Sequence, residues 1–209
     1  QKDLARLTDL EVPHVSIYGL TIEEGTAFGN WFKKGKIVPV EEDRSAADFL
    51  EIMSHLEKHG YDQYEISNFG LPGYYSRHNM SYWQGKRYLG IGPGAHSYDG
   101  KNRQFNVSNN PKYMDGIEKQ EAVHEMDELT DTDRMNEFML VSLRTQWGID
   151  LGRLKNEFGL DLMRVAGEYL NRIQEKGLIV LTSANLRLTK EGKLLADQVA
   201  EDLFQLPSE

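Results

Sequence analysis

The sequence predicts an α/β chain in two parts: a βαβ unit from an unfinished parallel sheet, then a winged-helix-like α+β domain. The first part is indicated by two β-rich stretches, residues 14–22 and 61–70, which enclose a helical pattern. The second is indicated by the order of helical and strand patterns over residues 131–204. With 209 residues, 39% of them hydrophobic, the chain can form one large or two small domains.

Charge and cysteine content narrow the possible functions. The chain has 24 Lys plus Arg against 33 Asp plus Glu, a formal net charge of -9. Nucleic acid is therefore not expected as the main partner, because phosphate neutralisation needs a basic face. There is no cysteine, so the chain can supply no disulfide, no thiol nucleophile and no cysteine ligand for zinc or an iron-sulfur cluster.

No apolar run approaches the roughly 20 residues of a membrane span. Residues 1–10 carry charges and no apolar segment typical of a signal peptide. We therefore expect a soluble, cytoplasmic protein. The chain starts with Gln and opens on leucines spaced by three, a pattern typical of a helix and of a chain cut from a longer one.

In the first part, residues 14–22 are rich in Val, Ile, Tyr and Thr and predict a strand. A helix is expected from an N-cap at Ser45 to its stop at Gly60, and a second strand over residues 61–70. Two strands cannot cover both faces of a sheet. The remaining strands are expected before Gln1.

The glycines at 90, 92 and 94 surround Pro93 in a loop that allows two interpretations. Its backbone amides could form an anion-binding nest, or the loop could be a tight turn at a strand end. The spacing is not that of the dinucleotide-binding fingerprint. The polar residues that follow, 101–130, are interpreted as a connector.

Residues 131–209 predict three helices, two strands around a Ser-Ala-Asn turn and a closing helix over residues 190–204. This order is typical of a winged-helix domain, whose third helix often reads DNA. Here residues 161–176 hold three basic and three acidic side chains, and residues 130–209 hold 10 basic and 13 acidic ones. The charge balance favours a packing or lid role over DNA binding.

His78, Asn79, Tyr82 and Trp83 bring an imidazole, a carboxamide and two large rings within six residues. A histidine can be an axial ligand of haem iron, and Tyr and Trp can cover the macrocycle. From composition alone, packing residues are the alternative interpretation.

A resemblance favours the haem interpretation. The string YEISNFGLPGYYSRHNMSYWQGKRYLGIGPGAHSY, with HVSIYGLTIEEGT before it and RLTKEG near the end, resembles the C-terminal part of the HemW family. These are radical S-adenosylmethionine proteins similar to the oxygen-independent coproporphyrinogen III oxidases. The resemblance covers essentially the whole chain, and HNxxYW followed by GIGPGAHS is its specific signature.

The resemblance implies a haem chaperone, which binds haem and passes it to acceptor proteins, with a [4Fe-4S] cluster and S-adenosylmethionine in its barrel. The family's haem-binding motif maps onto His78, Asn79, Tyr82 and Trp83. By comparison with the oxidases, Gly70 and His96 fall at S-adenosylmethionine-contacting positions, although the side chain differs from the oxidases at each. The resemblance leaves open covalent or non-covalent haem binding and membrane-associated acceptors.

The sequence lacks several features of the family that it resembles. The family's CxxxCxxC motif, its glycine-rich S-adenosylmethionine segment and its first barrel strands do not occur in the sequence, so the chain is not expected to be a radical enzyme alone. Residues 1–100 would be late strands and helices of an incomplete radical S-adenosylmethionine βα barrel, 101–130 the connector and 131–209 the winged-helix-like domain. The N-terminal half of its own barrel is then an expected partner. The alternatives are a coproporphyrinogen III oxidase and a winged-helix binding module.

Overall fold

Two separate clusters of buried apolar side chains organise the chain in the computed structural model, which describes residues 2–205. The smaller cluster lies in the N-terminal part and is formed by Val15, Met53, Leu56, Tyr61 and Phe69. The larger one lies in the C-terminal part, where it includes Met139, Leu143, Ile149, Leu154, Leu170, Leu186 and Leu203. The segments between them carry few buried apolar side chains.

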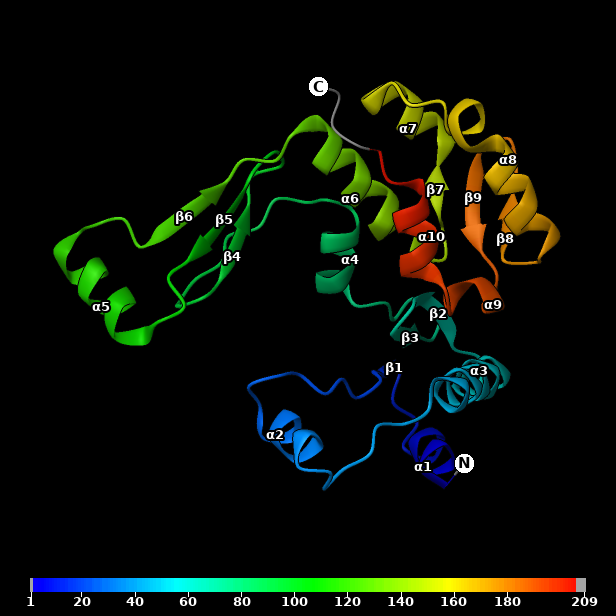
Figure 1. Ribbon diagram of the computed structural model, residues 1–209, viewed down its shortest axis with the longest axis horizontal. Helices are drawn as coiled ribbons and strands as arrows, with labels where there is room; N and C mark the ends of the chain where they lie inside the picture. Colours follow the sequence, from blue (N-terminus) through cyan, green and yellow to red (C-terminus); the bar gives the residue numbers. More distant parts are fainter. Residues whose placement is uncertain (1, 206–209) are drawn as a thin grey trace.

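The N-terminal part contains α1 (Lys2–Asp9), β1 (His14–Ser16), α2 (Ala27–Lys33), α3 (Glu42–Lys58), β2 (Asp62–Glu65) and β3 (Asn68–Gly70). The expected opening helix is confirmed as α1. The three strands form a sheet in the order β1-β3-β2, with both neighbours antiparallel to β3. Figure 1 shows α1 and α3 beside this sheet, at the foot of the molecule.

The single strand expected over residues 61–70 is wrong, and so is its direct parallel pairing with residues 14–22. The chain reverses between Glu65 and Asn68, so that β2 and β3 form a hairpin. The Glu65 carboxylate accepts hydrogen bonds from the Ser67 backbone N–H (2.9 Å) and the Asn68 side-chain amide (2.6 Å), which fixes this turn. The strands β1 and β2 run parallel to each other but are separated by β3.

Two element boundaries also differ from the expectation. The first strand ends at Ser16, and residues 18–21 are exposed and unpaired within the described chain. The helix predicted from Ser45 begins earlier, at Glu42, where Glu42 and Asp43 place negative charge in the first turn. Acidic side chains at that end stabilise a helix through its dipole. Gly60 follows the helix with a φ of 83°, as a stop signal requires.

The middle of the chain forms α4 (Arg77–Trp83), β4 (His96–Tyr98), β5 (Arg103–Asn106), α5 (Asn110–Lys119) and β6 (His124–Asp127). The strands form an antiparallel sheet in the order β4-β5-β6. Figure 1 shows this sheet and α5 extending as an arm away from the rest of the molecule.

The residues interpreted as a connector, 101–130, therefore carry β5, α5 and β6. The start of α5 is capped: the Asn109 side chain accepts the Lys112 backbone N–H at 3.1 Å, and Pro111 occupies the first turn. At the other end of α5, Gly116 lies against Val123, which leaves no space there for a side chain. Because this segment is polar, its sequence did not indicate the packing of α5.

The C-terminal part contains α6 (Asp131–Leu143), β7 (Ile149–Asp150), α7 (Leu151–Phe158), α8 (Leu162–Glu175), β8 (Ile179–Leu181), β9 (Asn185–Leu188), α9 (Lys190–Lys193) and α10 (Ala196–Leu203). The three expected helices and the strand pair are confirmed. Thr130 and Asp133 form a capping box at the start of α6, and Asp150 and Asp161 cap α7 and α8. The sheet order is β7-β9-β8.

The single closing helix expected over residues 190–204 is divided into α9 and α10. Gly192 in α9 approaches the backbone of Leu178 so closely that a Cβ atom would lie 1.9 Å from the Leu178 carbonyl oxygen. Thr189 caps α9 by accepting the Gly192 N–H at 3.0 Å. This close contact places α9 against the start of β8. The next helix, α10, packs on α6.

The contact between α9 and β2 predicts how the stability of the chain depends on pH. Lys193 donates a hydrogen bond to the Gln63 side chain (2.9 Å), and burial, followed by repulsion from Lys190, lowers the pKa of Lys193 to about 8. Between about pH 8 and the unfolded pKa of 10.5, the unfolded chain binds more protons than the folded chain, so stability rises with pH in this window.

The variant Lys193→Met should lack this rise and be more stable than the wild type at pH 7, by roughly 3 kcal/mol at most. Urea unfolding from pH 7 to 10.5 measures both effects. The exposed Lys176, changed to Met, is the matched control and should leave the pH profile unchanged. Identical slopes for wild type and Lys193→Met would show that Lys193 is not buried as a charge.

The molecule is open for its size. Its solvent-accessible surface is 14091 Å² for a mass of 24.0 kDa, whereas a compact monomer of that mass exposes about 9,900 Å². Many exposed large apolar side chains lie in the first forty residues, among them Leu10, Tyr18, Leu20, Phe28, Trp31, Phe32, Val38 and Val40. Among the described helices, none is long and apolar enough to cross a membrane.

Candidate functional site

The residues predicted to contact haem lie on one short helix, α4. Ser76 caps it: the Ser76 hydroxyl accepts the Asn79 backbone N–H at 3.2 Å. The Ser76 backbone N–H donates to the hydroxyl of Tyr64 (3.3 Å), which is also hydrogen-bonded to the His14 ring (2.7 Å). The start of α4 is thus fixed to both β2 and β1.

This anchor consists of neutral groups. Tyr64 is fully buried and stacks on Tyr75, with ring centroids 4.6 Å apart. Burial raises the pKa of the Tyr64 hydroxyl and lowers the pKa of His14. Both shifts favour the uncharged forms, so the hydrogen bond between them needs no buried charge.

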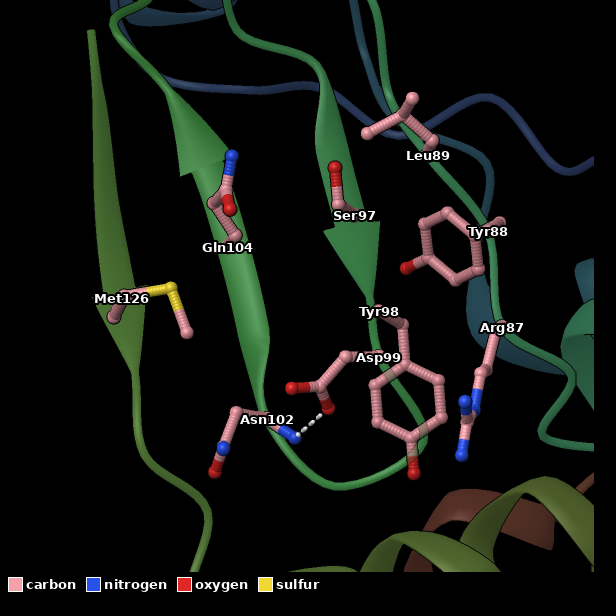
Figure 2. A pocket seen from close by; sticks show the side chains of 9 residues that line it. All are labelled: Arg87, Tyr88, Leu89, Ser97, Tyr98, Asp99, Asn102, Gln104 and Met126. Carbon is pink, nitrogen blue, oxygen red and sulfur yellow. Dashed lines mark hydrogen bonds between the residues drawn. The ribbon is translucent and has the colours of Figure 1, made fainter. Parts of the chain in front are cut away.

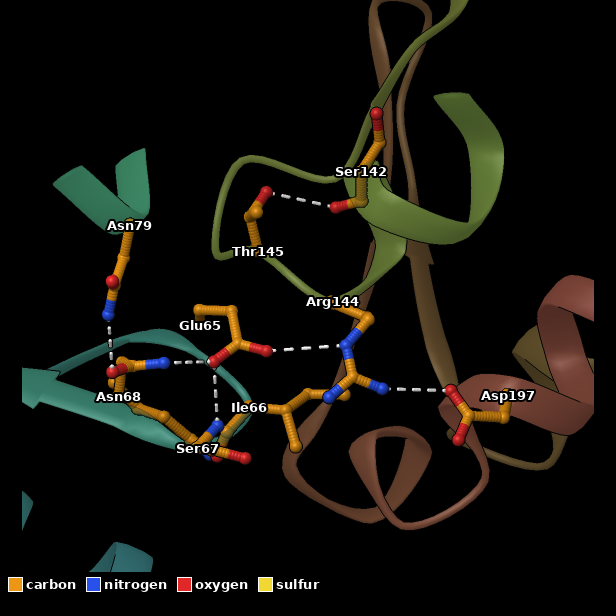
Figure 3. Close-up of polar contacts among 10 residues, drawn as sticks. Glu65, Ile66, Ser67, Asn68, Asn79, Ser142, Arg144, Thr145 and Asp197 are labelled. Carbon is orange, nitrogen blue, oxygen red and sulfur yellow. Dashed lines mark hydrogen bonds and ion pairs between the residues drawn. The ribbon is translucent and has the colours of Figure 1, made fainter. Parts of the chain in front are cut away.

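Asn79 faces the N-terminal sheet. Its side-chain amide donates to the side-chain oxygen Oδ1 of Asn68 at 3.1 Å, and that oxygen also accepts the Ser16 hydroxyl at 2.8 Å. The Asn68 amide in turn donates to Glu65. Figure 3 shows this chain of contacts running from α4 to the β2–β3 turn. Asn79 therefore orients α4 on the sheet.

The same network reaches the C-terminal part. Glu65 is 1% exposed, and its second carboxylate oxygen lies 3.3 Å from the Arg144 Nε. Arg144, just after α6, also pairs with Asp197 of α10 at 2.9 Å (Figure 3). The Ile66 N–H donates to the Arg144 carbonyl oxygen, and the Gln146 N–H to that of Tyr64. The β2–β3 turn is thus bonded to the segment after α6.

His78 and Tyr82 lie one helical turn apart and, unlike Asn79, do not face the N-terminal sheet. The His78 ring is exposed and meets the Tyr82 ring edge-on, with centroids 4.9 Å apart. Tyr82 meets Tyr88 at 4.8 Å, and Tyr88 meets Tyr98 of β4 at 6.2 Å. No hydrogen bond to the His78 ring occurs within residues 2–205, so its nitrogens are available to a ligand.

Tyr82 and Trp83 line a cavity of about 530 Å³ between the end of α4, the β4–β5 turn, α6 and α7. This volume lies in the range of small-molecule sites. The Trp83 Nε1 is buried and has no hydrogen-bond partner in the described structure. An unpaired buried N–H costs about 1–3 kcal/mol.

Of the four predicted haem residues, Tyr82 and Trp83 therefore lie at one cavity and His78 lies beside Tyr82. Asn79 does not line the cavity, and its amide is bonded to Asn68. The haem contacts themselves remain predictions.

The glycine loop does not form a nest. The Gly90 N–H donates to the Ser97 hydroxyl (2.9 Å), the Gly92 N–H to the Tyr113 hydroxyl (3.4 Å) and the Gly94 N–H to the Val107 carbonyl (3.1 Å). Asn106 donates to the Gly92 carbonyl at 2.9 Å. A Cβ at Gly90 would lie 2.1 Å from the His96 carbonyl oxygen. The interpretation as a structural turn is the correct one.

Gly70 and His96, predicted to contact S-adenosylmethionine, lie on different sheets: Gly70 ends β3, and His96 begins β4. A Cβ at Gly70 would meet the Tyr75 ring at 3.1 Å, so close packing already accounts for the glycine. The exposed His96 ring lies 6.0 Å from that of Phe105. Their role toward S-adenosylmethionine stays a prediction.

A second hollow, of about 390 Å³, lies over the β4–β5 hairpin. Figure 2 shows Leu89, Tyr88 and Tyr98 along one side and Gln104 and Met126 along the other. Tyr88 and Tyr98 line both hollows. This second hollow adjoins the candidate site, and its two charged lining side chains, Arg87 and Asp99, are of opposite sign.

Sequence reasoning missed several residues that build the site. Glu65 and Arg144 are 79 positions apart, and nothing local pairs them. The arginines of α6 and α7 at the cavity resemble ordinary helix-surface charges in the sequence. Asn68 lay near the C-terminal end of the strand predicted over residues 61–70, where barrel ligands collect, but in the structure it begins β3.

The chain is similar in sequence to proteins of one family. Residues 129–195 match the HemN C-terminal domain family. The chain is 36% identical over 191 residues to the haem chaperone HemW of Bacillus subtilis, a match that covers 91% of this chain and 50% of that protein. It is 31% identical over 201 residues to the haem chaperone HemW of Lactococcus lactis, covering 96% and 53%.

The chain spans about half the length of these curated relatives. A solved structure of the Escherichia coli coproporphyrinogen III oxidase HemN, described as a radical S-adenosylmethionine enzyme, matches with a TM-score of 0.74. The match covers 97% of this chain and 50% of that one at 17% identity, and it shows a shared fold.

Proposed function

We propose, because this chain belongs to the HemN/HemW family as its C-terminal portion, that it helps to bind haem and to pass it to acceptor proteins. One structural observation carries the proposal: α4 brings Tyr82 and Trp83 to a cavity and holds the exposed His78 ring against Tyr82. His78 would ligate the iron, and the two aromatic side chains would contact the macrocycle.

Asn79 has a different part in this proposal. Its side chain is hydrogen-bonded to Asn68, so it would hold α4 in position rather than touch haem. This differs from the role that the resemblance alone suggests for it.

The coproporphyrinogen III oxidase alternative is supported by fold similarity at 17% identity, while the matches at 31% and 36% identity are named haem chaperones. The residues present do not fit a [4Fe-4S] cluster, because the chain has no cysteine to ligate iron. We therefore assign no radical step to this chain.

The N-terminal half of the barrel remains the proposed partner of the exposed apolar side chains in residues 10–40. The unpaired segment after β1, with Tyr18 70% and Leu20 76% exposed, would gain a neighbouring strand from it. The haem acceptor proteins and the cytoplasmic location are further predictions.

The C-terminal part would be winged-helix-like, since three helices are followed by a strand pair and β7 completes a small sheet. Its proposed role is packing: Arg144, just after α6, joins the Glu65 network, and α6 supplies Phe138 to the cavity wall. The neutral α8 gives no support to DNA binding.

Replacement of His78 by Ala tests the ligand assignment. On titration of the chain with ferric haem, we expect the Soret band to shift and the affinity to fall at least about tenfold, as loss of a metal contact does. His124→Ala, an exposed histidine on β6, is the matched control and should behave as wild type. The same Soret band and affinity for His78→Ala and wild type would refute His78 ligation.

A further inference from the structure

The cavity beside α4 has a charge opposite to that of the chain. Its cationic side chains are Lys86, Arg103, Arg134 and Arg153, and its acidic side chains are Glu137 and Glu157. The chain as a whole has a formal charge of -9. Counted over the lining residues alone, this is an excess of two positive charges, although Arg134 also pairs with Asp131 outside the lining. A positive concave site favours an anionic ligand.

Internal ion pairs account for two of these cations. Arg103 pairs with Glu137, and Arg153 pairs with Glu157 through both carboxylate oxygens, at 2.9 and 3.0 Å. Arg153 also lies over the Phe138 ring, 4.6 Å from its centroid. These two arginines are therefore neutralised and held within the wall.

The other two cations, Lys86 and Arg134, have no acidic partner in the cavity. Lys86 is exposed and forms no ion pair within residues 2–205. Arg134 bonds to Asp131 through Nη2, but its Nη1 is buried without a partner.

Unpaired donors are concentrated here. The described residues contain three buried side-chain nitrogens without a hydrogen-bond partner, and two of them, Trp83 Nε1 and Arg134 Nη1, belong to residues that line the cavity. A carboxylate is the acceptor that suits a guanidinium best.

The remaining wall is aromatic, and consists of Tyr82, Trp83, Tyr88, Tyr98, Phe138 and Phe158. A ligand that satisfies this wall and the two cations is broad, flat and apolar, with two carboxylates at its edge. Haem has this chemistry, with one propionate for each cation.

We infer that Lys86 and Arg134 hold the two propionates of haem, a refinement that rests on the proposed function. The Arg134 guanidinium donates to one carboxylate, and Lys86 pairs with the other at the open side. Tyr82 and Trp83 cover the macrocycle between these cations and His78. The cations set specificity for a free dicarboxylate porphyrin.

The experiment compares two ligands, ferric haem and its dimethyl ester, which lacks both negative charges. The wild-type chain and the double variant Lys86→Gln with Arg134→Gln are titrated with each at low ionic strength. We expect the double variant to bind haem at least about tenfold more weakly and the ester as well as wild type does. Lys112→Gln with Arg164→Gln, two exposed cations elsewhere, is the matched control.

Arg134→Lys, with Lys86 intact, keeps the charge without the planar fork and should recover part of the haem affinity. Circular dichroism and urea unfolding check that each variant is folded. If the wild type binds haem and the ester equally, or the double variant weakens both equally, the propionate assignment is wrong although haem binding stands. If the wild type binds neither, the proposed function fails with it.

Discussion

Replacing Glu65 by Ala should lower the free energy of unfolding by about 3–5 kcal/mol, the cost of removing one partner from a buried ion pair. Glu65 is almost fully buried and accepts hydrogen bonds from the Ser67 N–H, the Asn68 amide and Arg144. Without it, the Asn68 amide and the Arg144 guanidinium lose their shared acceptor, and the β2–β3 turn loses its internal brace.

Urea unfolding at pH 7 measures this effect. Glu24→Ala is the matched control, because Glu24 pairs with Lys33 at the surface with its side chain 87% exposed, and such pairs contribute at most about 1 kcal/mol. Because Asn68 holds Asn79, Glu65→Ala should also weaken haem binding. A loss of stability no greater than that of Glu24→Ala would show that Glu65 does not tie the two parts together.

Gly148→Ala should destabilise the C-terminal part by roughly 2–5 kcal/mol, from backbone strain and overpacking combined. Gly148 has a φ of 69°, in the left-handed region that L-residues with a side chain avoid. Its Cβ would also lie 2.0 Å from the Leu186 carbonyl oxygen, on the central strand β9. The turn into β7 must therefore shift.

The matched control is Gly167→Ala in α8, where nothing lies within 4 Å of the new methyl group. There the substitution should stabilise the chain by about 0.5–1 kcal/mol, since Ala loses less backbone entropy in a helix. Thermal and urea unfolding measure the loss of stability expected for Gly148→Ala and the gain expected for Gly167→Ala. Equal effects at the two glycines would contradict the packing described for β7 and β9.

Local signals predicted the C-terminal helices well. Residues 131–175 combine a clear apolar period with capping side chains at Thr130, Asp150 and Asp161, so sequence and structure agree there. The arm formed by β4, β5, α5 and β6 was missed, because its strands are short and polar and pair with one another across the helix.

The sheet at the foot of the molecule was misread for a related reason. A run rich in Tyr, Ile and Phe satisfies the strand pattern whether or not it turns at its centre. The turn is fixed by the Glu65 carboxylate, whose other partner lies beyond α6. Tertiary contact therefore decided the pairing.

For the site, the motif grouped four residues that share α4, but it predicted neither the helix nor where their side chains point. A helical spacing of four places His78 beside Tyr82, as observed, while Asn79 turns toward Asn68. The cavity and its cations arise from segments between residues 82 and 158, and no local pattern joins them.

We propose that haem binds at the cavity formed by the end of α4. Haem affinity of Tyr82→Leu with Trp83→Leu tests it most directly, because leucine keeps apolar volume but removes both rings and the unpaired Trp83 N–H. The control is Phe28→Leu with Trp31→Leu, an exposed aromatic pair on α2. We predict at least about tenfold weaker haem binding for the first pair, by the usual worth of aromatic contacts, and no change for the second. Wild-type affinity in the folded Tyr82→Leu, Trp83→Leu variant would contradict the account.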